Sequence, residues 1–428
     1  MPSASDAMEG LRRTDPRQSG RIRVLVLSRN YPNNVMELLG LWVQGQVREA
    51  ARHCDVKVIS PVPYSPPLPG LPEEYARFRR VARRRREGDV EILHPRFFLG
   101  PGYSTHRIEW LLYYAGVHKS VVRVRRDFPF DVIHAHFTYP DGVVAAHLGR
   151  YFGVPVVITE QNPWGPWLEK YPGVRRQAIW AARQSACQIA ISRAVRNTIE
   201  AYTGKLEQLS VIPDGVDGSV FTLGETSGRS ADQILFVGVI RPVKGLDVLL
   251  KAVRRLVDRG RKVTLLVIGE AFYTAYRQEE LRLKKLASDL NLSDHVRFAG
   301  KQPFPELVRQ MQRSAVLVLP SRSEALGVVL VEALACGTPV VATRSGGPED
   351  VVNDEVGVLT AVDDPGALAQ GIEQVLDCQA QYDPARLRAY ALQNFGLGSV
   401  GQRLLRVYEH VSGRIPEESS VGAAARVP

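Results

Sequence analysis

Short runs of β-branched and aliphatic residues alternate along the chain with longer amphipathic segments of helix length. Six runs occupy the first half of the sequence, and the pattern then restarts with six more. Strands that alternate with helices form a parallel, doubly wound sheet, so the pattern predicts two similar α/β domains. The predicted strands are 23–28, 55–60, 131–136, 154–159, 187–192 and 209–213, followed by 232–238, 262–269, 295–300, 315–320, 339–343 and 357–360.

The segment at 214–230 separates the two sets of strands. It is rich in Gly, Asp and Ser and has no hydrophobic period, which is typical of a linker. The sequence therefore predicts two Rossmann-like domains, at 21–213 and at 231–395. Because ligands bind beyond the carboxyl ends of parallel strands, two such domains that face each other form a central cleft between them. We expect the functional residues at those strand ends.

The two ends of the chain lack this pattern. Residues 1–20 contain no apolar core of a signal peptide, and their composition predicts a disordered leader. Residues 413–428 are poor in large apolar side chains and predict a frayed tail. No apolar run approaches the roughly 18 residues of a membrane span, so we expect a cytoplasmic protein rather than an integral membrane protein.

Length and composition agree with two globular domains. A chain of 428 residues exceeds the size at which one core keeps growing, and 45% hydrophobic with 23% charged residues is an ordinary globular composition. The cysteines are widely spaced and form no CxxC pair, which predicts buried thiols rather than a disulfide framework or a zinc site. They are Cys54, Cys187, Cys336 and Cys378.

The net charge of +10 comes mostly from one run of residues, RFRRVARRRR at 77–86. It carries seven arginines and no acid, and without it the chain has 48 basic against 45 acidic residues. Arg77 to Arg86, alternating loosely with Tyr75, Phe78 and Val81, fit a basic amphipathic helix, whose partner is an anionic membrane surface. A solvated helix or loop face explains the run equally well. No base-stacking module accompanies it, so nucleic acid is not expected as a partner.

Two glutamates, Glu324 and Glu332, stand with seven residues between them in the apolar stretch SRSEALGVVLVEALACGTPVV. The pattern predicts a loop that holds Glu324 and a helix that begins near Leu326 and carries Glu332 on its second turn. Eight residues along a helix rise about 12 Å and turn about 80° beyond two full turns, so the carboxylates can reach one long ligand at two places. The amides around Leu326, Gly327 and Val328 favour an anion such as a diphosphate. A capping Glu324 and a solvated Glu332 are the structural alternative.

A second candidate loop follows the strand at 232–238. Gly238 ends this strand, a helix begins near Gly245, and Arg241 and Lys244 lie between them. Cations at a strand end and beside a helix start receive anionic groups, so both side chains are candidate phosphate ligands. Two solvated loop cations are the alternative.

The stretch DVIHAHFTYPDG places two histidines on one face of a strand. His136 ends the strand next to the predicted cleft, where we expect it to bond to substrate, whereas His134 fits a hydrogen-bonded core position. H-x-H with only Asp131 or Asp141 as a nearby third ligand is weak for zinc, so no metal site is predicted.

Two more loops are candidate ligand contacts. The loop SRNYPNNVMELLG at 28–40 follows the first strand but contains no G-x-G-x-x-G, so a dinucleotide-dependent oxidoreductase loses support. The turn GGPED at 346–350 predicts backbone amides that are free for a ligand, although a plain Gly-Gly turn also explains it.

Together these blocks resemble the family 4 (group 1) retaining glycosyltransferases of the GT-B fold, from about residue 22 to 412. The resemblance implies that the first domain binds the acceptor and the second the nucleotide sugar. It also implies that NFGLGSVGQRLLRVYEHV forms a last helix, at 396–412, that crosses back to the N-terminal domain. The blocks that carry it, in family order, are DVIHAHFTYPDG, AISRAVRNTI, VIPDGVDGSVF, VGVIRPVKGLDVLL, PSRSEALGVVLVEALACGTPVVAT and SGGPEDVV.

The resemblance implies a role for each donor-site residue. Glu324 would contact the donor sugar and Glu332 the nucleotide ribose, with the diphosphate on the helix amides between them. Lys244 would neutralise the diphosphate. The family's arginine directly after the strand-end glycine is Val239 here, and Arg241 is its candidate substitute.

The resemblance extends to the reacting sugar and the acceptor. His136 matches the second histidine of the family's H-x-H, which lies near the reacting sugar. Ala325 and Leu326 stand where the family commonly has Gly and Phe, which alters the frame of sugar recognition. The loop candidates for acceptor contact are Asn30, Gly40, Glu160 and Asn162.

The implied reaction is transfer of a hexosyl unit from a nucleotide-sugar donor to a hydroxyl of a sugar, lipid-linked or small-molecule acceptor. The anomeric configuration would be retained, and neither a metal nor a cofactor would be needed. An acceptor in a glycolipid or a cell-envelope polysaccharide precursor would place the enzyme at the inner face of the plasma membrane. The alternatives are a GT-B epimerase or phosphorylase, or a catalytically silent sugar-nucleotide-binding subunit.

Overall fold

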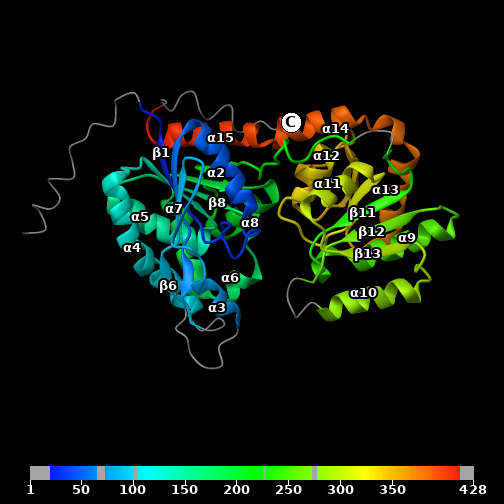
Figure 1. Cartoon of the computed structure of the whole chain (residues 1–428), viewed down its shortest axis with the longest axis horizontal. Helices are drawn as coiled ribbons and strands as arrows, with labels where there is room; N and C mark the ends of the chain where they lie inside the picture. The colour runs from blue at the N-terminus through cyan, green and yellow to red at the C-terminus, as the bar shows by residue number, and fades with distance from the viewer. Residues whose placement is uncertain (1–19, 65–72, 101–104, 225–227, 272–276, 415–428) are drawn as a thin grey trace, which may run out of the picture.

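The computed structural model describes residues 20–64, 73–100, 105–224, 228–271 and 277–414. Within these ranges the chain forms two α/β domains that lie side by side (Figure 1). Most of the predicted leader, and the tail beyond residue 414, lie outside the described residues.

The N-terminal domain is built on one eight-stranded sheet. All neighbouring strands are parallel except the last pair, β5 and β4, which is antiparallel. A separate parallel pair, β3 (Val62–Tyr64) and β6 (Arg96–Phe98), lies beside it. The order of the large sheet is β10 (Leu209–Val211), β9 (Cys187–Ala190), β8 (Val156–Glu160), β7 (Val132–His136), β1 (Arg23–Leu27), β2 (Asp55–Ile59), β5 (Val90–Leu93) and β4 (Arg84–Glu87).

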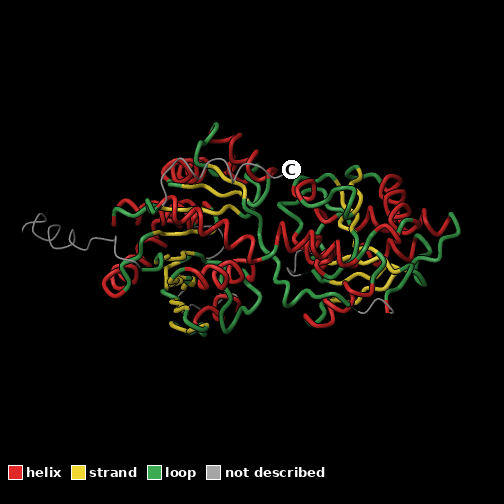
Figure 2. The backbone as a smooth tube through the Cα atoms, turned by 90° about the horizontal axis from the view of Figure 1, so that it is seen from above, coloured by secondary structure: helices red, strands yellow, loops and turns green. Residues whose placement is uncertain are grey.

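The C-terminal domain is built on a six-stranded, fully parallel sheet. Its first strand in sequence, β11, lies in the middle, so the chain winds outward in both directions as a doubly wound fold does. Helices lie on both sides of the strands in each domain (Figure 2). The order of this sheet is β13 (Val296–Gly300), β12 (Thr264–Ile268), β11 (Gln233–Val237), β14 (Val316–Leu319), β15 (Val340–Thr343) and β16 (Gly357–Thr360).

The helices fill the intervals between strands, as the alternating pattern predicts. Their amphipathic faces cover the sheets, and central strands such as β7 and β8 are buried along their whole length. The helices are α2 (Leu41–His53), α3 (Glu73–Arg79), α4 (Glu109–Asp127), α5 (Val143–Phe152), α6 (Pro166–Lys170), α7 (Pro172–Gln184), α8 (Arg193–Thr203), α9 (Leu246–Asp258), α10 (Arg277–Asp289), α11 (Phe304–Arg313), α12 (Val328–Ala335), α13 (Pro365–Asp377), α14 (Pro384–Phe395) and α15 (Leu397–Val411).

The last helix, α15, belongs to the core of the N-terminal domain although it follows the C-terminal one. It packs against α2, and its buried side chains Val400, Leu404 and Tyr408 join the apolar cluster under β1 and β2. Figure 1 shows α14 over one domain and α15 over the other. The two domains are therefore joined by two chain crossings rather than one.

The two crossings are hydrogen-bonded to each other. Val216 donates its N–H to the carbonyl of Phe395 at 2.8 Å, and Leu397 donates to the carbonyl of Val216 at 3.0 Å. The domains also meet at the start of α8, where the backbone N–H and guanidinium of Arg193 bind Asp350 of the other domain. These contacts fix how the two sets of strand ends face each other.

The arginine run does not form one amphipathic helix, which corrects the prediction from the sequence. Its first residues end α3 and its last residues form the edge strand β4. The apolar side chains Phe78 and Val81 are half-buried and buried, so they do not provide an exposed apolar face. Arg84 and Arg85 form ion pairs with Glu91 and Glu87. The run lies at the edge of the sheet, where charged strands are favoured because they block pairing with other chains.

No helix in the described part of the chain is long and apolar enough to cross a membrane.

Candidate functional site

Two loops of the C-terminal domain meet through a lysine and a glutamate. Lys244, in the loop after β11, donates from Nζ to both carboxylate oxygens of Glu324, at 3.0 and 2.7 Å. Ser321 also donates to Glu324, at 2.9 Å. Both charged side chains are largely buried, so their pairing is little weakened by water. The sequence predicted both as ligand-binding residues, and the structure brings them together.

The backbone around this pair is held in place by contacts between the same two loops. Arg322 donates its N–H to the carbonyl of Val243 at 2.7 Å, and its guanidinium binds Asp247. Gly245 has φ +65°, and a Cβ there would lie 2.0 Å from the carbonyl oxygen of Pro320. Only glycine allows the loops to approach so closely, which explains the Lys-Gly pair in physical terms.

The other predicted residues of the first loop lie close by. Gly238 directly follows β11, and its carbonyl oxygen would be 1.9 Å from a Cβ on Gly269, so the ends of β11 and β12 pass close together. Arg241 is exposed and begins the short turn that carries Lys244. Val239 is 40% exposed. These strand ends have the open surface that a ligand requires.

The start of α12 follows directly after Glu324. The helix begins at Val328 rather than near Leu326, after Gly327 with φ +85°. The side chain of Leu326 is buried, so this residue can offer a ligand only its backbone. The unpaired N–H groups of a first helical turn, with the helix dipole, favour an anion in front of them.

Glu332 lies half-buried on the second turn of α12. Burial raises the pKa of its carboxyl to about 7. Among the described residues none donates a hydrogen bond to this carboxyl. A ligand with hydroxyl groups would supply the missing donors, and bonding to the ionised form would lower the pKa again.

Replacing Glu332 with glutamine is expected to stabilise the ligand-free protein above neutral pH. The folded protein favours the protonated carboxyl, so the contribution of Glu332 to stability falls as pH rises from about 4.5 through 7. The variant should be more stable by about 1–2 kcal/mol at pH 8 and equal to wild type near pH 4.5. Thermal unfolding at both pH values measures this. Equal stabilities at pH 8 would contradict the inferred burial of the charge.

The two glycine amides of the turn GGPED are not free for a ligand, which corrects a second prediction. The turn packs against the Glu324 loop instead. The N–H of Gly347 binds the carbonyl of Glu324 at 2.9 Å, and the N–H of Gly346 binds the carboxylate of Glu349. Both amides are therefore occupied. A Cβ on Gly347 would lie 2.3 Å from the backbone nitrogen of Leu326, so the glycine pair is needed to let the two loops pack.

A separate cavity of about 260 Å³ lies beyond the ends of β1, β7 and β8 in the N-terminal domain. Three of the four predicted acceptor residues line it, namely Asn30, Glu160 and Asn162. Gly40 does not line it. A Cβ on Gly40 would lie 2.1 Å from the carbonyl oxygen of Asn30, so Gly40 lets the first loop fold back and supports the cavity indirectly.

The carboxylate of Glu160 is fully occupied by donors of its own loop and of the segment after β7. It accepts from the N–H groups of Thr138, Gln161 and Asn162 and from the indole of Trp164, all at 3.0 to 3.1 Å. A carboxylate offers about four acceptor sites, so none remains for a substrate. Glu160 thus shapes the cavity wall rather than reaching into the cavity.

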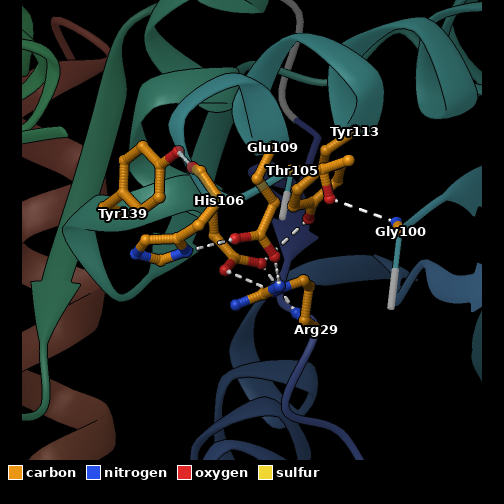
Figure 3. Close-up of polar contacts among 8 residues, drawn as sticks. Arg29, Gly100, Thr105, His106, Glu109, Tyr113 and Tyr139 are labelled. Carbon is orange, nitrogen blue, oxygen red and sulfur yellow. Dashed lines mark hydrogen bonds and ion pairs between the residues drawn. The ribbon is translucent and has the colours of Figure 1, made fainter. Parts of the chain in front are cut away.

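Arg29 lies in the same cavity between two buried carboxylates. Its guanidinium binds Glu109, which also contacts His106 at 2.9 Å (Figure 3). The guanidinium lies 3.7 Å from the carboxylate of Asp141. Burial opposes the charge on Arg29, but Glu109 and Asp141 together raise its pKa. Burial also raises the pKa of Asp141, to about 6, although Arg29 works against it.

His136 points into the interior and does not line the cavity. The ring is 1% exposed, lies 4.5 Å from that of His134, and has Gln161 as its polar neighbour at 3.5 Å. Burial, followed by His134, holds its pKa well below the usual range. His134 bonds to Tyr408 and Thr159, as expected of a core histidine. A direct role for His136 in catalysis stays a prediction.

The acidic residues that the sequence considered as metal ligands are in ion pairs. Asp131 binds Arg23, and Asp141 faces Arg29. Within the described ranges no group of three or more His, Cys, Asp or Glu side chains could hold a metal ion.

Several cavity residues were not predicted from the sequence. Arg29, Tyr139, Trp164 and Trp167 line the cavity but were not singled out, although Arg29 lies in the candidate loop at 28–40 and Tyr139 in the block DVIHAHFTYPDG. The signal that could have found the tryptophans is NPWGPW, an aromatic, Gly- and Pro-rich stretch directly after β8.

The two Rossmann-like domains differ in what they present. The C-terminal domain has a lysine–glutamate pair beside a helix start, and the N-terminal domain has a separate polar and aromatic cavity. Two such domains side by side are the architecture of the GT-B glycosyltransferases.

Sequence comparison agrees. Residues 226–393 match the family described as Glycosyl transferases group 1, and residues 100–219 match Glycosyltransferase Family 4. The D-inositol 3-phosphate glycosyltransferase of Frankia alni is 31% identical over 73% of this chain and 82% of its own length. That of Catenulispora acidiphila is 34% identical over 65% and 72%. The chain belongs to glycosyltransferase family 4, group 1.

Solved structures support the fold. Sucrose-phosphate synthase from Thermosynechococcus elongatus has a TM-score of 0.74 at 18% identity, covering 92% of this chain and all of its own. HepE from Anabaena, in complex with UDP, has a TM-score of 0.68 at 20% identity, with 91% and 100% covered. At these identities the likeness concerns the fold alone.

Proposed function

We propose that this glycosyltransferase moves a hexosyl unit from a nucleotide sugar to an acceptor hydroxyl, with retention of configuration and without a metal ion. The observation that carries the proposal is the Lys244–Glu324 pair at the start of α12. A cation, a carboxylate and the unpaired N–H groups of the first turn of α12 therefore lie close enough together to contact one ligand. Glu332 on the next turn would reach the ribose.

The chemistry follows from where charge develops. A bond forms between the acceptor oxygen and the anomeric carbon, and the bond from that carbon to the diphosphate oxygen breaks. The diphosphate leaves with the electron pair, and the proton of the acceptor hydroxyl passes to a diphosphate oxygen. Lys244 and the first-turn amides of α12 would stabilise the growing negative charge, which is the role that a metal ion fills in other enzymes. Closing of the two domains would exclude water from the donor.

Similar proteins suggest which substrates to test first. HepE has been solved with UDP-glucose, so uridine-diphosphate sugars are the first donors to try. The D-inositol 3-phosphate glycosyltransferases suggest a phosphorylated polyol as one acceptor class. An acceptor in a glycolipid or cell-envelope polysaccharide precursor is the other class that we consider.

We also propose that the enzyme works in the cytoplasm and attaches to the anionic inner face of the plasma membrane. The four cysteines are free thiols, which suits a reducing compartment. Six arginines of the basic run are exposed, namely Arg77, Arg79, Arg80, Arg83, Arg84 and Arg86. Because Phe78 and Val81 do not provide an exposed apolar face, the attachment would be electrostatic and salt-sensitive.

Vesicle sedimentation tests the attachment. Binding to vesicles with phosphatidylserine that is lost at 0.5 M salt is expected. Absence of binding at low salt would contradict the proposed attachment to the membrane.

The test of the transferase is a screen of nucleotide sugars for acceptor-dependent release of the nucleoside diphosphate. We expect release with at least one donor, and a product that contains both the sugar and the acceptor. Binding of donors without turnover would instead support a catalytically silent subunit, and a product without acceptor would support an epimerase or a phosphorylase.

A further inference from the structure

The cavity of the N-terminal domain has features that select among acceptors. Its volume of about 260 Å³ is at the low end of small-molecule sites, which suits one ring rather than a long chain. The cavity is lined by Arg29, Asn30, Phe137, Thr138, Tyr139, Asp141, Glu160, Asn162, Trp164, Trp167 and Ala178.

Aromatic side chains form much of the cavity wall. Trp164 is 3% exposed and is held by its indole bond to Glu160 at 3.0 Å, and Tyr139 is held by a bond to the carbonyl of His106 at 2.6 Å. Trp167, on the short helix α6, is 41% exposed and so presents its ring at the surface. Fixed aromatic rings provide flat apolar faces against which the C–H side of a sugar ring packs.

The charges around the cavity oppose a phosphate. Among the described lining residues, Arg29 is the one Lys or Arg side chain. Its charge is already balanced by Glu109 and Asp141, whose side chains are 6% and 2% exposed. Glu160 adds a carboxylate to the wall. A phosphate entering this cavity would meet the carboxylates of Asp141 and Glu160 on its wall and a guanidinium that Glu109 helps to neutralise from behind the wall. Like charges at close range exclude each other.

The polar groups that remain available suit neutral hydroxyls. The carboxamides of Asn30 and Asn162 line the cavity and have no hydrogen-bond partner among the described side chains and backbone. Each carboxamide has both a donor and an acceptor, which matches a hydroxyl group in either direction. Asn162 also lies on the loop whose backbone Glu160 fixes.

We propose that this cavity binds an unphosphorylated sugar ring of the acceptor, stacked on Trp167 and Trp164 and hydrogen-bonded to Asn30 and Asn162. The proposal rests on the transferase function and narrows its acceptor to the class of neutral saccharides. Glu109 and Asp141 act as specificity residues, because they cancel the one charge that could attract a phosphate.

Paired acceptors test the inference. With the donor that the screen identifies, the full-length enzyme is assayed on methyl glucoside against glucose 6-phosphate and on inositol against inositol 3-phosphate. We expect kcat/KM to be at least tenfold higher for the neutral member of the productive pair. Equal rates, or a preference for the phosphorylated member, would overturn the inference and leave the transferase function intact. If no donor is turned over with any acceptor, the transferase function fails and the inference fails with it.

Two variants add an independent readout. Trp167→Ala is expected to raise the acceptor KM at least fivefold and to leave the Kd of the donor unchanged, whereas Tyr151→Ala, an exposed aromatic on α5 outside the cavity, should leave both unchanged. Glu109→Gln should unmask Arg29 and reduce the preference for the neutral acceptor at least threefold. A wild-type acceptor KM in Trp167→Ala would overturn the stacking, even if Glu109→Gln fails to fold.

Discussion

Replacing Lys244 with alanine is expected to lower kcat about a hundredfold or more. In the proposed mechanism its ammonium group stabilises the diphosphate as it leaves, and removing one such donor to a developing negative charge typically costs a factor of about 100 to 1,000. The ligand-free structure adds a second reason, because the variant leaves Glu324 with Ser321 as its remaining side-chain donor. Steady-state release of the nucleoside diphosphate at saturating donor measures the effect.

A matched control separates the site from general basicity. Lys251 is exposed on α9, seven residues further along, and Lys251→Ala should keep the wild-type rate. Thermal unfolding of both variants checks that the fold survives. If Lys244→Ala keeps more than half of the wild-type kcat, the cation does not act on the leaving group.

Replacing Glu324 with glutamine is expected to lower transfer at least tenfold while the protein stays folded. The proposed role of the carboxylate is to accept hydroxyls of the donor sugar, and it is held for this by Lys244 and Ser321. A glutamine keeps the shape but offers half of the acceptor capacity and no charge, so both sugar contact and the orientation of Lys244 are lost. The measurement is kcat/KM for the donor, with the thermal unfolding midpoint in parallel.

The structural alternative for Glu324 predicts something different. If the residue only ties two loops together, Glu324→Gln should lower the unfolding midpoint in proportion to any loss of activity. Glu355→Gln, at an exposed position of the same domain, serves as the matched control and should change neither quantity. Wild-type turnover by a folded Glu324→Gln protein would remove the assigned role.

The sequence predicted the strands well because parallel strands buried on both faces are continuous apolar runs. All twelve predicted strands are present, within about two residues at each end. It missed the short strands β3, β4, β5 and β6, which lie between residues 62 and 98. For β4 the reason is that RRRE contains no apolar residue and pairs only at the edge of the sheet through its backbone. The same reason explains why the arginine run was expected as a helix, since strand pairing at an edge leaves no hydrophobic pattern.

The spacing of residues in the sequence predicted where the residues of the candidate donor site lie along the chain. Glu324, Lys244 and Glu332 stand at the positions expected for the two loops and the helix between them. What spacing could not provide is which groups bind each other. The amides of Gly346 and Gly347 bond within the protein, and the carboxylate of Glu160 accepts from its own loop and from Thr138 after β7. Such pairings depend on tertiary contacts between segments far apart in the chain.

The cavity in the N-terminal domain was the part least visible in the sequence. Arg29, Glu109 and Asp141 are separated by tens of residues and meet only because α4 begins near the ends of β1 and β7. No local sequence pattern predicts that the charge of Arg29, after β1, is neutralised by the carboxylates of Glu109 and Asp141 from two other elements. The selectivity proposed for neutral acceptors therefore comes from the fold.

The anomeric configuration of the first-formed product tests the central claim most directly. Proton NMR of the early reaction, with an α-linked nucleotide sugar and an acceptor, reports the new linkage before the product can change. The account predicts a glycoside joined to the acceptor with the α configuration retained, formed in step with release of the nucleoside diphosphate. A β-linked product, or free sugar and sugar phosphate without a glycoside, would contradict it.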